Sequence, residues 1–224
     1  MMQPSTARGL VTERTLWIGG AQWAGKTTVA QILAMRHGLV HYSYDYHDAR
    51  AHMTKAMSQP DRYPHRSTIR SADDEWVETS PRAMAQRAMQ SFRERFVMVL
   101  EELAALPGST PILADGWGLR PDLVLPHLHS PRQAVFLVPS DGFREQQLRD
   151  LPRARAFPAD LRVSDPDRAQ RNRIARDILL AQDVVESAER LGLRVITIDG
   201  SLPPDEIALA LEEHFRPYLE PWLY

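Results

Sequence analysis

Glycines, a lysine and a threonine near the start of the chain stand at a spacing that can hold a phosphate chain. The stretch reads Gly20-Ala21-Gln22-Trp23-Ala24-Gly25-Lys26-Thr27-Thr28. It contains the Walker A spacing G-x-x-x-x-G-K-[ST], in which backbone N–H groups surround phosphate oxygens and the following helix adds its positive N-terminal end. Lys26 would reach the outer phosphates as a catalytic cation, and the Thr27 hydroxyl would ligate Mg²⁺. We expect all nine residues to bind the phosphate donor.

A glycine turn that happens to be followed by a lysine would match the same motif. Lysine is rare in this chain, however, because Lys26 and Lys55 are the only two among 27 basic residues. The context also fits, since the apolar run 15–18 predicts a strand before the loop and the spacing of apolar residues in 27–37 predicts a helix after it. A strand, a glycine loop and a helix in this order favour the phosphate-binding interpretation.

Two aspartates stand at the ends of predicted strands. Asp115 follows the buried strand 111–114, where it would be a partner of Mg²⁺, or a residue that only caps a loop. Asp45 follows the strand 39–44, where it would act as a general base or orient an acceptor hydroxyl. Asp45 could also be the N-cap of a helix beginning at Tyr46, and the two roles are compatible.

The segment from about 45 to 80 is rich in aromatic rings, histidines and arginines, and its part from 58 to 79 lacks clear periodicity. A surface loop would have a similar composition; the functional interpretation is a pocket for a phosphate acceptor. The expected acceptor-binding residues are Asp45, His47, Asp48, Arg70 and Trp76. Asp48 and His52 share a helical face, which would either hold a metal or be solvated.

Residues from about 149 to 168 contain three prolines and several arginines, and this composition predicts a mobile lid. Phosphoryl transfer requires cations around the transferred group, and one well-placed arginine can be worth about 10³ to 10⁵ in rate. The expected catalytic arginines are Arg149, Arg153 and Arg155, with Arg168, Arg173 and Arg176 also available.

Strand and helix patterns alternate along the whole chain. The predicted strands are 15–18, 39–44, 111–114, 133–138 and 194–198, and the predicted helices include 27–37, 81–105, 121–128, 166–191 and 204–214. This alternation is typical of a single α/β domain, in which a mostly parallel sheet carries helices on both faces.

Composition excludes several classes of protein. A formal net charge of -2 gives no global field for nucleic acid or an anionic membrane, and the absence of cysteine excludes disulfides and zinc-thiolate sites. Residues 1–13 form a polar leader without the apolar core of a signal peptide, and no apolar run approaches about 18 residues. We expect a cytoplasmic protein that binds neither nucleic acid nor membrane, and nothing indicates an oligomer.

Together the loop at 20–28, Asp45, the Asp115-Gly116 turn and the arginine-rich lid resemble the P-loop nucleoside and nucleotide kinase group. That group includes adenylate kinase, shikimate kinase and chloramphenicol phosphotransferase. The resemblance implies a three-layer P-loop fold with strand order 2-3-1-4-5, ATP as donor, Mg²⁺ as cofactor and a small-molecule acceptor. It also implies that adenine lies between Arg149 at the lid start and Asp199-Gly200 after the fifth strand.

The sequence Asp115-Gly116-Trp117-Gly118-Leu119-Arg120 is similar to the nucleoside monophosphate kinase turn D-G-[FY]-P-R, but it lacks the proline and its arginine comes one place later. No N-K-x-D guanine motif or L-S-G-G-Q transporter signature is present. The expected function is therefore an ATP-dependent phosphotransferase acting on a hydroxyl or phosphate of a small molecule. The alternative is an ATP-binding regulatory protein that phosphorylates no acceptor.

Overall fold

A five-stranded parallel sheet forms the centre of the molecule. The computed structural model describes residues 13–64 and 69–219. Its strands are β1 (Thr15–Gly20), β2 (Val40–Ser43), β3 (Ile112–Asp115), β4 (Ala134–Pro139) and β5 (Arg194–Ile198). They pair in the order β2-β3-β1-β4-β5, and every pairing is parallel. The predicted P-loop fold and its strand order are therefore confirmed.

The central strand β1 is buried along its whole length, so both of its faces are covered. Leu16 and Ile18 pack into the apolar cluster of helices α2 (Lys26–His37) and α11 (Pro204–Leu219). Trp17 packs into the cluster of helices α6 (Pro81–Ala105) and α10 (Pro166–Arg190) on the other face. Adjacent side chains of a strand point to opposite faces, and a strand covered on both faces carries an unbroken apolar run. Gly19 and Gly20, which end β1, therefore lie at the middle of the sheet's carboxyl edge.

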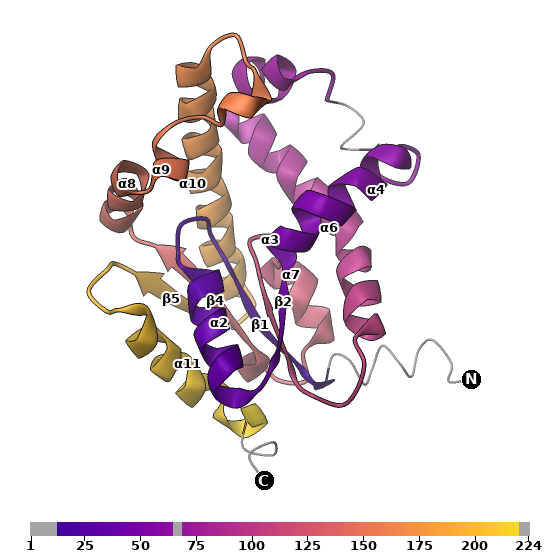
Figure 1. The fold of residues 1–224 in the computed structure, drawn as a ribbon, viewed down its shortest axis with the longest axis vertical. Helices are drawn as coiled ribbons and strands as arrows, with labels where there is room; N and C mark the ends of the chain where they lie inside the picture. Colours follow the sequence, from indigo (N-terminus) through magenta and orange to yellow (C-terminus); the bar gives the residue numbers. More distant parts are fainter. Residues whose placement is uncertain (1–12, 65–68, 220–224) are drawn as a thin grey trace.

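The helices form one layer on each face of the sheet. The longer ones are α2 (Lys26–His37), α6 (Pro81–Ala105), α8 (Asp141–Asp150), α10 (Pro166–Arg190) and α11 (Pro204–Leu219). Helices α2 and α11 lie together on one side, and α6 lies on the other (Figure 1). None of the helices in the described ranges combines the length and the apolar character needed to span a membrane.

The segment 45–80 is helical from 45 to about 57, as its sequence predicts, and it contains one further helical turn beyond that part. It contains α3 (Tyr44–His47), the π-helix η1 (Asp48–His52), α4 (Met53–Ser58) and the π-helix η2 (Asp74–Glu78). The interpretation of 58–79 as irregular is therefore wrong at η2. A π turn does not follow the 3.6-residue period, so an apolar pattern based on that period misses it.

The predicted lid, residues 149–168, includes α9 (Pro152–Arg155) and the 3-10 turn η5 (Ala159–Leu161). Its Phe157 is buried against Val77 and Ala169, and its ring meets the Trp76 ring edge to face at 5.4 Å. The lid segment and the segment around η2 thus lie against each other at the top of the molecule (Figure 1). The predicted polar leader, apart from Glu13, and residues 65–68 lie outside the described ranges.

The turn between β3 and β4 contains α7 (Pro121–Val124) and the 3-10 turns η3 (Leu125–His127) and η4 (Pro131–Gln133). Arg120 precedes α7 and is buried, where it donates hydrogen bonds to the Leu180 carbonyl oxygen and to Asp183 of α10. Burial lowers the pKa of Arg120, and the Asp183 carboxylate opposes that shift. The arginine that follows the Asp115-Gly116 turn is therefore a structural link to α10.

Candidate functional site

The phosphate loop joins the end of β1 to the start of α2. Gly20 has φ +128°, and a Cβ there would come within 2.0 Å of the Leu137 carbonyl oxygen on β4, so only glycine fits. Gly25 takes the left-handed conformation at the N-cap of α2. The Lys26 ammonium donates to the Ala21 carbonyl oxygen at 2.6 Å, across the loop. The backbone thus curves around Lys26 at the N-terminus of a 12-residue helix.

The remaining loop residues differ in burial. Ala24 is buried, Gln22 and Trp23 are partly buried, and Thr28 is exposed. Trp23 has φ 67°, which is unusual for a residue with a large side chain. The Arg173 guanidinium of α10 lies 5.9 Å from the centroid of the Trp23 ring, so the indole connects the loop to α10. Such strain is typical of functional loops, where the surrounding structure maintains it.

Three carboxylates surround Lys26. Burial lowers the pKa of the lysine, and the negative charges of Asp45, Asp115 and Asp177 oppose that shift. They come from α3, β3 and α10, which are far apart in the sequence. Asp177 is buried and was not among the residues predicted from sequence. Burial raises its pKa, against the opposing charge of Arg176.

Asp115 is completely buried at the end of β3. One carboxylate oxygen accepts a hydrogen bond from the Thr27 hydroxyl at 2.6 Å, and the other lies 2.7 Å from His41 Nε2 of β2. The geometry therefore brings together the two predicted partners of Mg²⁺ and adds a histidine that sequence reasoning did not assign. The Asp115 side chain bonds to α2 and β2 and not to the loop that follows it, so the loop-capping alternative does not describe its contacts.

Oxygen ligands of this kind suit Mg²⁺, which is usually held by one or two carboxylates together with substrate phosphates. In the part of the chain that the structure describes, no three His, Cys, Asp or Glu side chains converge as ligands for a metal ion. The hydroxyl of Thr27 and the carboxylate of Asp115 fit a metal that a phosphate chain helps to hold. They do not fit a metal cage built by the protein alone.

Asp45 lies in the first turn of α3, and its Oδ1 accepts a hydrogen bond from the Trp117 backbone N–H at 3.2 Å. The helix begins at Tyr44 and has no side-chain cap, so the prediction that Asp45 caps a helix beginning at Tyr46 is wrong. The carboxylate instead joins the loop after β3. Burial raises its pKa, while the positive charge of Lys26 lowers it.

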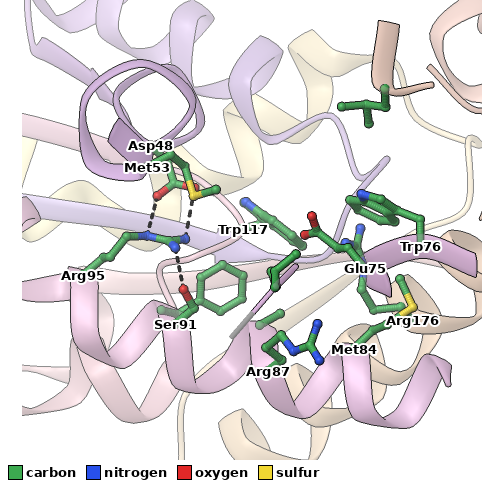
Figure 2. A pocket seen from close by; sticks show the side chains of 14 residues that line it. Asp48, Met53, Glu75, Trp76, Met84, Arg87, Ser91, Arg95, Trp117 and Arg176 are labelled. Atoms are coloured by element: carbon green, nitrogen blue, oxygen red, sulfur yellow. Dashed lines mark hydrogen bonds and ion pairs between the residues drawn. The ribbon is translucent and has the colours of Figure 1, made fainter. Parts of the chain in front are cut away.

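A cavity of about 240 Å³ lies between α6, the segment 45–80 and the loop after β3 (Figure 2). Its lining consists of Asp48, Met53, Ile69, Glu75, Trp76, Met84, Arg87, Ala88, Ser91, Phe92, Arg95, Trp117, Leu161 and Arg176. Trp117 connects the cavity to Asp45 of α3, because its backbone N–H donates to that carboxylate and its ring lines the cavity.

Of the five residues predicted to bind an acceptor, Asp48 and Trp76 line this cavity. Asp45 lies beside it, bound to Trp117. His47 stacks on Tyr42 at 4.5 Å between ring centroids and pairs with Glu102 at 3.3 Å. Arg70 has an exposed side chain that binds Asp74.

The prediction that Asp48 and His52 lie on a solvated face is wrong, because both are buried. Asp48 pairs with Arg95 of α6 at 2.9 Å and accepts a hydrogen bond from the Tyr44 hydroxyl. His52 lies 3.0 Å from Glu102. An arginine of α6 thus neutralises the aspartate, and this pairing explains its burial.

Two arginines of α10, Arg173 and Arg176, lie over Trp23 and Trp117. Arg176 lies 5.3 Å from the Trp117 ring centroid and binds Asp177 through two N–H groups. Of the predicted catalytic arginines, Arg149 is exposed and its carbonyl oxygen accepts a hydrogen bond from exposed Arg155. The side chain of Arg153 and its contacts lie outside what the structure describes. Arg168 lies in the first turn of α10, and its backbone N–H donates to the N-cap Asp165.

The loop after β5 lies beside the start of α8. Asp199 is exposed and accepts hydrogen bonds from the backbone and the hydroxyl of Ser201, and these bonds lower its pKa. Gly200 lies against the Phe143 ring of α8, whereas Arg149 stands near the other end of that helix. The location of adenine between Arg149 and Asp199-Gly200 stays a prediction.

The strand order and the glycine loop after β1 give the chain a P-loop kinase-like fold. No protein-family model matches the chain, and no curated protein matches it at a significant level. Solved structures similar to it include shikimate kinase from Aquifex aeolicus, with 13% identity, a TM-score of 0.43, and coverage of 90% of this chain and 96% of that one.

Thymidylate kinase from Candida albicans is 13% identical with a TM-score of 0.48, and the alignment covers 91% of each chain. A gluconokinase from Sinorhizobium meliloti 1021 is 14% identical with a TM-score of 0.42, covering 93% of this chain and 95% of that one. At these identities the likeness concerns the fold alone.

Proposed function

We propose that the protein is an ATP-dependent kinase that transfers the γ-phosphate to a small molecule bound in the cavity beside Trp117. One observation carries the proposal: Trp117 offers its ring to the cavity and its backbone N–H to Asp45, which lies in the electrostatic field of Lys26. The Asp45 carboxylate thus lies between Lys26 of the phosphate loop and the cavity that Trp117 lines. Phosphoryl transfer needs this juxtaposition of donor and acceptor.

In this proposal residues 20–28 bind the phosphates of ATP through backbone N–H groups and the N-terminus of α2. Lys26 exchanges its contact with the Ala21 carbonyl oxygen for a contact with phosphate oxygens, where it neutralises charge. Thr27 and Asp115 would hold Mg²⁺, which supplies further neutralisation of the phosphate oxygens when it is bound.

Asp45 is the proposed general base. The acceptor oxygen forms a bond to the γ-phosphorus, the bond from that phosphorus to the β–γ bridging oxygen breaks, and ADP leaves with the electron pair. The hydroxyl proton passes to the Asp45 carboxylate and then to solvent. Burial raises the pKa of Asp45, which makes this carboxylate a stronger base than an exposed aspartate.

Positive charge for the transferred group is available on α10. Arg173 lies over Trp23 of the phosphate loop and Arg176 lies over Trp117, so we propose these two as the arginines that stabilise the transition state. Arg149, Arg153 and Arg155 belong to the proposed lid, residues 149–168, and would reach phosphate only through a movement of that segment. Residues 45–80 form the proposed acceptor-binding segment.

The test is ADP formation by the purified protein with ATP and Mg²⁺, measured with and without each member of a panel of alcohols, nucleosides and nucleotides. We expect ADP to form only when an acceptor is present, together with an acceptor product that carries one more phosphoryl group by mass spectrometry. Lys26→Ala should remove this activity and provides the control for a contaminating kinase.

An ATP-binding regulatory protein would bind ATP equally well, so binding alone does not separate the two functions. Saturable ATP binding without ADP formation for every acceptor class would favour the regulatory alternative. ADP formation that is independent of any acceptor would identify an ATPase and would also contradict the proposal.

A further inference from the structure

The chemistry of the cavity narrows the class of acceptor. We infer that the acceptor is a small uncharged alcohol built on a single ring, and that the cavity disfavours nucleoside monophosphates and acidic metabolites. This inference rests on the proposed function for the transfer step, whereas the ligand class itself can be tested by binding alone.

Size is the first argument. The volume of the cavity is about 240 Å³. It lies below the range of about 300 to 1,000 Å³ that is usual for ligands of drug size. One ring with short substituents matches a space of this size better than a nucleotide with base, ribose and phosphate does.

The second argument is the lining, which is apolar or aromatic at most positions. These side chains are Met53, Ile69, Trp76, Met84, Ala88, Phe92, Trp117 and Leu161. Phe92 and Trp117 meet edge to face at 4.8 Å, and this contact fixes two ring surfaces of the wall. Rigid aromatic surfaces bind the face or edge of another ring, and each contact removes apolar area from water.

The third argument is charge. Of the three arginines in the lining, Arg95 is paired with Asp48, and Arg176 is paired with Asp177 behind the wall. Arg87 and Glu75 add one charge of each sign to the lining. A phosphate dianion in this cavity would lie beside Asp48 and Glu75 and would have to compete with carboxylates for both paired arginines.

The polar groups are placed to bind a neutral substituent. Asp48, Arg95 and Ser91 form a connected set at one end of the cavity, and Glu75, Trp76 and Arg176 lie at the other, with Trp117 between them (Figure 2). A paired carboxylate and guanidinium offer an acceptor and a donor side by side, which suits a hydroxyl, amide or carbonyl group. The reacting hydroxyl would lie near Trp117, beside Asp45.

The first test compares neutral ring compounds with carboxylates of similar size, in the absence of ATP. The pairs are mandelamide with mandelate, benzyl alcohol with benzoate, and cyclohexylmethanol with cyclohexanecarboxylate. Binding is measured by tryptophan fluorescence and by calorimetry. We expect at least one neutral member to bind about ten-fold or more tightly than its carboxylate, a difference of about 1.4 kcal/mol. The inference is overturned if no neutral member is preferred, including the case in which none binds.

The second test changes the charge of the cavity with Asp48→Asn, which leaves Arg95 without its carboxylate. The ratio of affinities should shift about ten-fold or more toward the carboxylate of each pair, because Arg95 becomes free to bind it. Asp122→Asn is the matched control, since it unpairs Arg93 on the outer surface of α6 at 3.0 Å and should leave the ratio unchanged. Equal ratios in both variants would contradict the charge argument.

Loss of a buried partner is costly, so the fold of Asp48→Asn must be checked by thermal melting. If that variant does not fold, the comparison of ligand pairs on the unmodified protein decides the question.

ADP formation with the same compounds then separates the two proposals. Preferred binding of neutral ligands without any ADP formation would refute the kinase and leave the ligand class intact. ADP formation that is fastest with acidic or phosphorylated acceptors would refute the ligand class and leave the kinase.

Discussion

Replacement of Asp45 by asparagine separates the chemical role of this residue from its structural one. The amide oxygen of asparagine can still accept the hydrogen bond from the Trp117 backbone N–H, so the link between α3 and the loop after β3 is kept. The change removes the negative charge that lies near Lys26 and the capacity to accept a proton. Any effect of Asp45→Asn on rate therefore reports on charge and proton transfer.

A positioned general base contributes about 10² to 10⁴ in rate, and the lower limit corresponds to about 2.7 kcal/mol of activation free energy. We therefore expect kcat to fall by about 10² or more. ATP affinity should stay within about three-fold, because Asp45 is outside the loop that binds the phosphates. In the unmodified protein kcat should also fall as the pH decreases through the raised pKa of Asp45, and this dependence should be absent in the variant.

The pH dependence of stability gives an independent check of the raised pKa of Asp45, and the direction of the expected change follows from that shift. Because burial raises the pKa of Asp45 in the folded protein, its contribution to stability is complete below the ordinary aspartate pKa and is lost as the pH rises through the folded value. Asparagine does not titrate. The unfolding free energy of Asp45→Asn should therefore increase relative to that of the unmodified protein as the pH rises from about 4 to about 7.

The assay combines kcat with a phosphorylated acceptor, calorimetry of ATP binding, and denaturant unfolding at both pH values. A folded Asp45→Asn variant with unmodified kcat would refute the role of Asp45 as base. A variant that loses stability at neutral pH would instead assign the carboxylate a structural function.

Three further variants test the rest of the site. Lys26→Ala should keep its melting temperature and lose about 10² or more in ATP turnover, and turnover equal to that of the unmodified protein would remove Lys26 from the site. Asp115→Asn should weaken ATP binding much more with Mg²⁺ than without it by calorimetry; equal losses would make Asp115 structural. Arg176→Ala leaves buried Asp177 without its partner and should cost about 3 to 5 kcal/mol in denaturant unfolding. Adding Asp177→Asn should recover part of that loss, and no recovery would show that charge is not the cause.

Much of the architecture could be predicted because its signals are local. The buried run at β1, the glycines that end it and the helical spacing after Lys26 are adjacent in sequence, and the strand order followed from resemblance to a known group. The approach of Asp115 to Thr27 was also predictable. Carboxyl ends of neighbouring parallel strands meet at one edge of the sheet, and β1 pairs with β3.

Contacts between distant helices could not be predicted. Asp177 is one of many polar residues on α10, and only packing decides that it enters the field of Lys26. Asp48 has the sequence pattern of a solvated face, yet Arg95 of α6 pairs with it and permits its burial. Periodicity places a helix against the sheet, but it does not specify which charged side chains of two helices will meet.

Trp76 takes part in two contacts at once, since its indole lines the cavity and meets the Phe157 ring of the lid segment. A ligand that displaces the indole must also disturb Phe157, so occupancy of the cavity and the position of residues 149–168 are thermodynamically linked. If a nucleotide moves this segment, it must also change the affinity for the acceptor. By reciprocity, the acceptor then changes the affinity for the nucleotide by the same factor. In the proposed kinase this aromatic pair helps to couple nucleotide and acceptor, and removal of the Phe157 ring should reduce the factor by which each changes the affinity for the other.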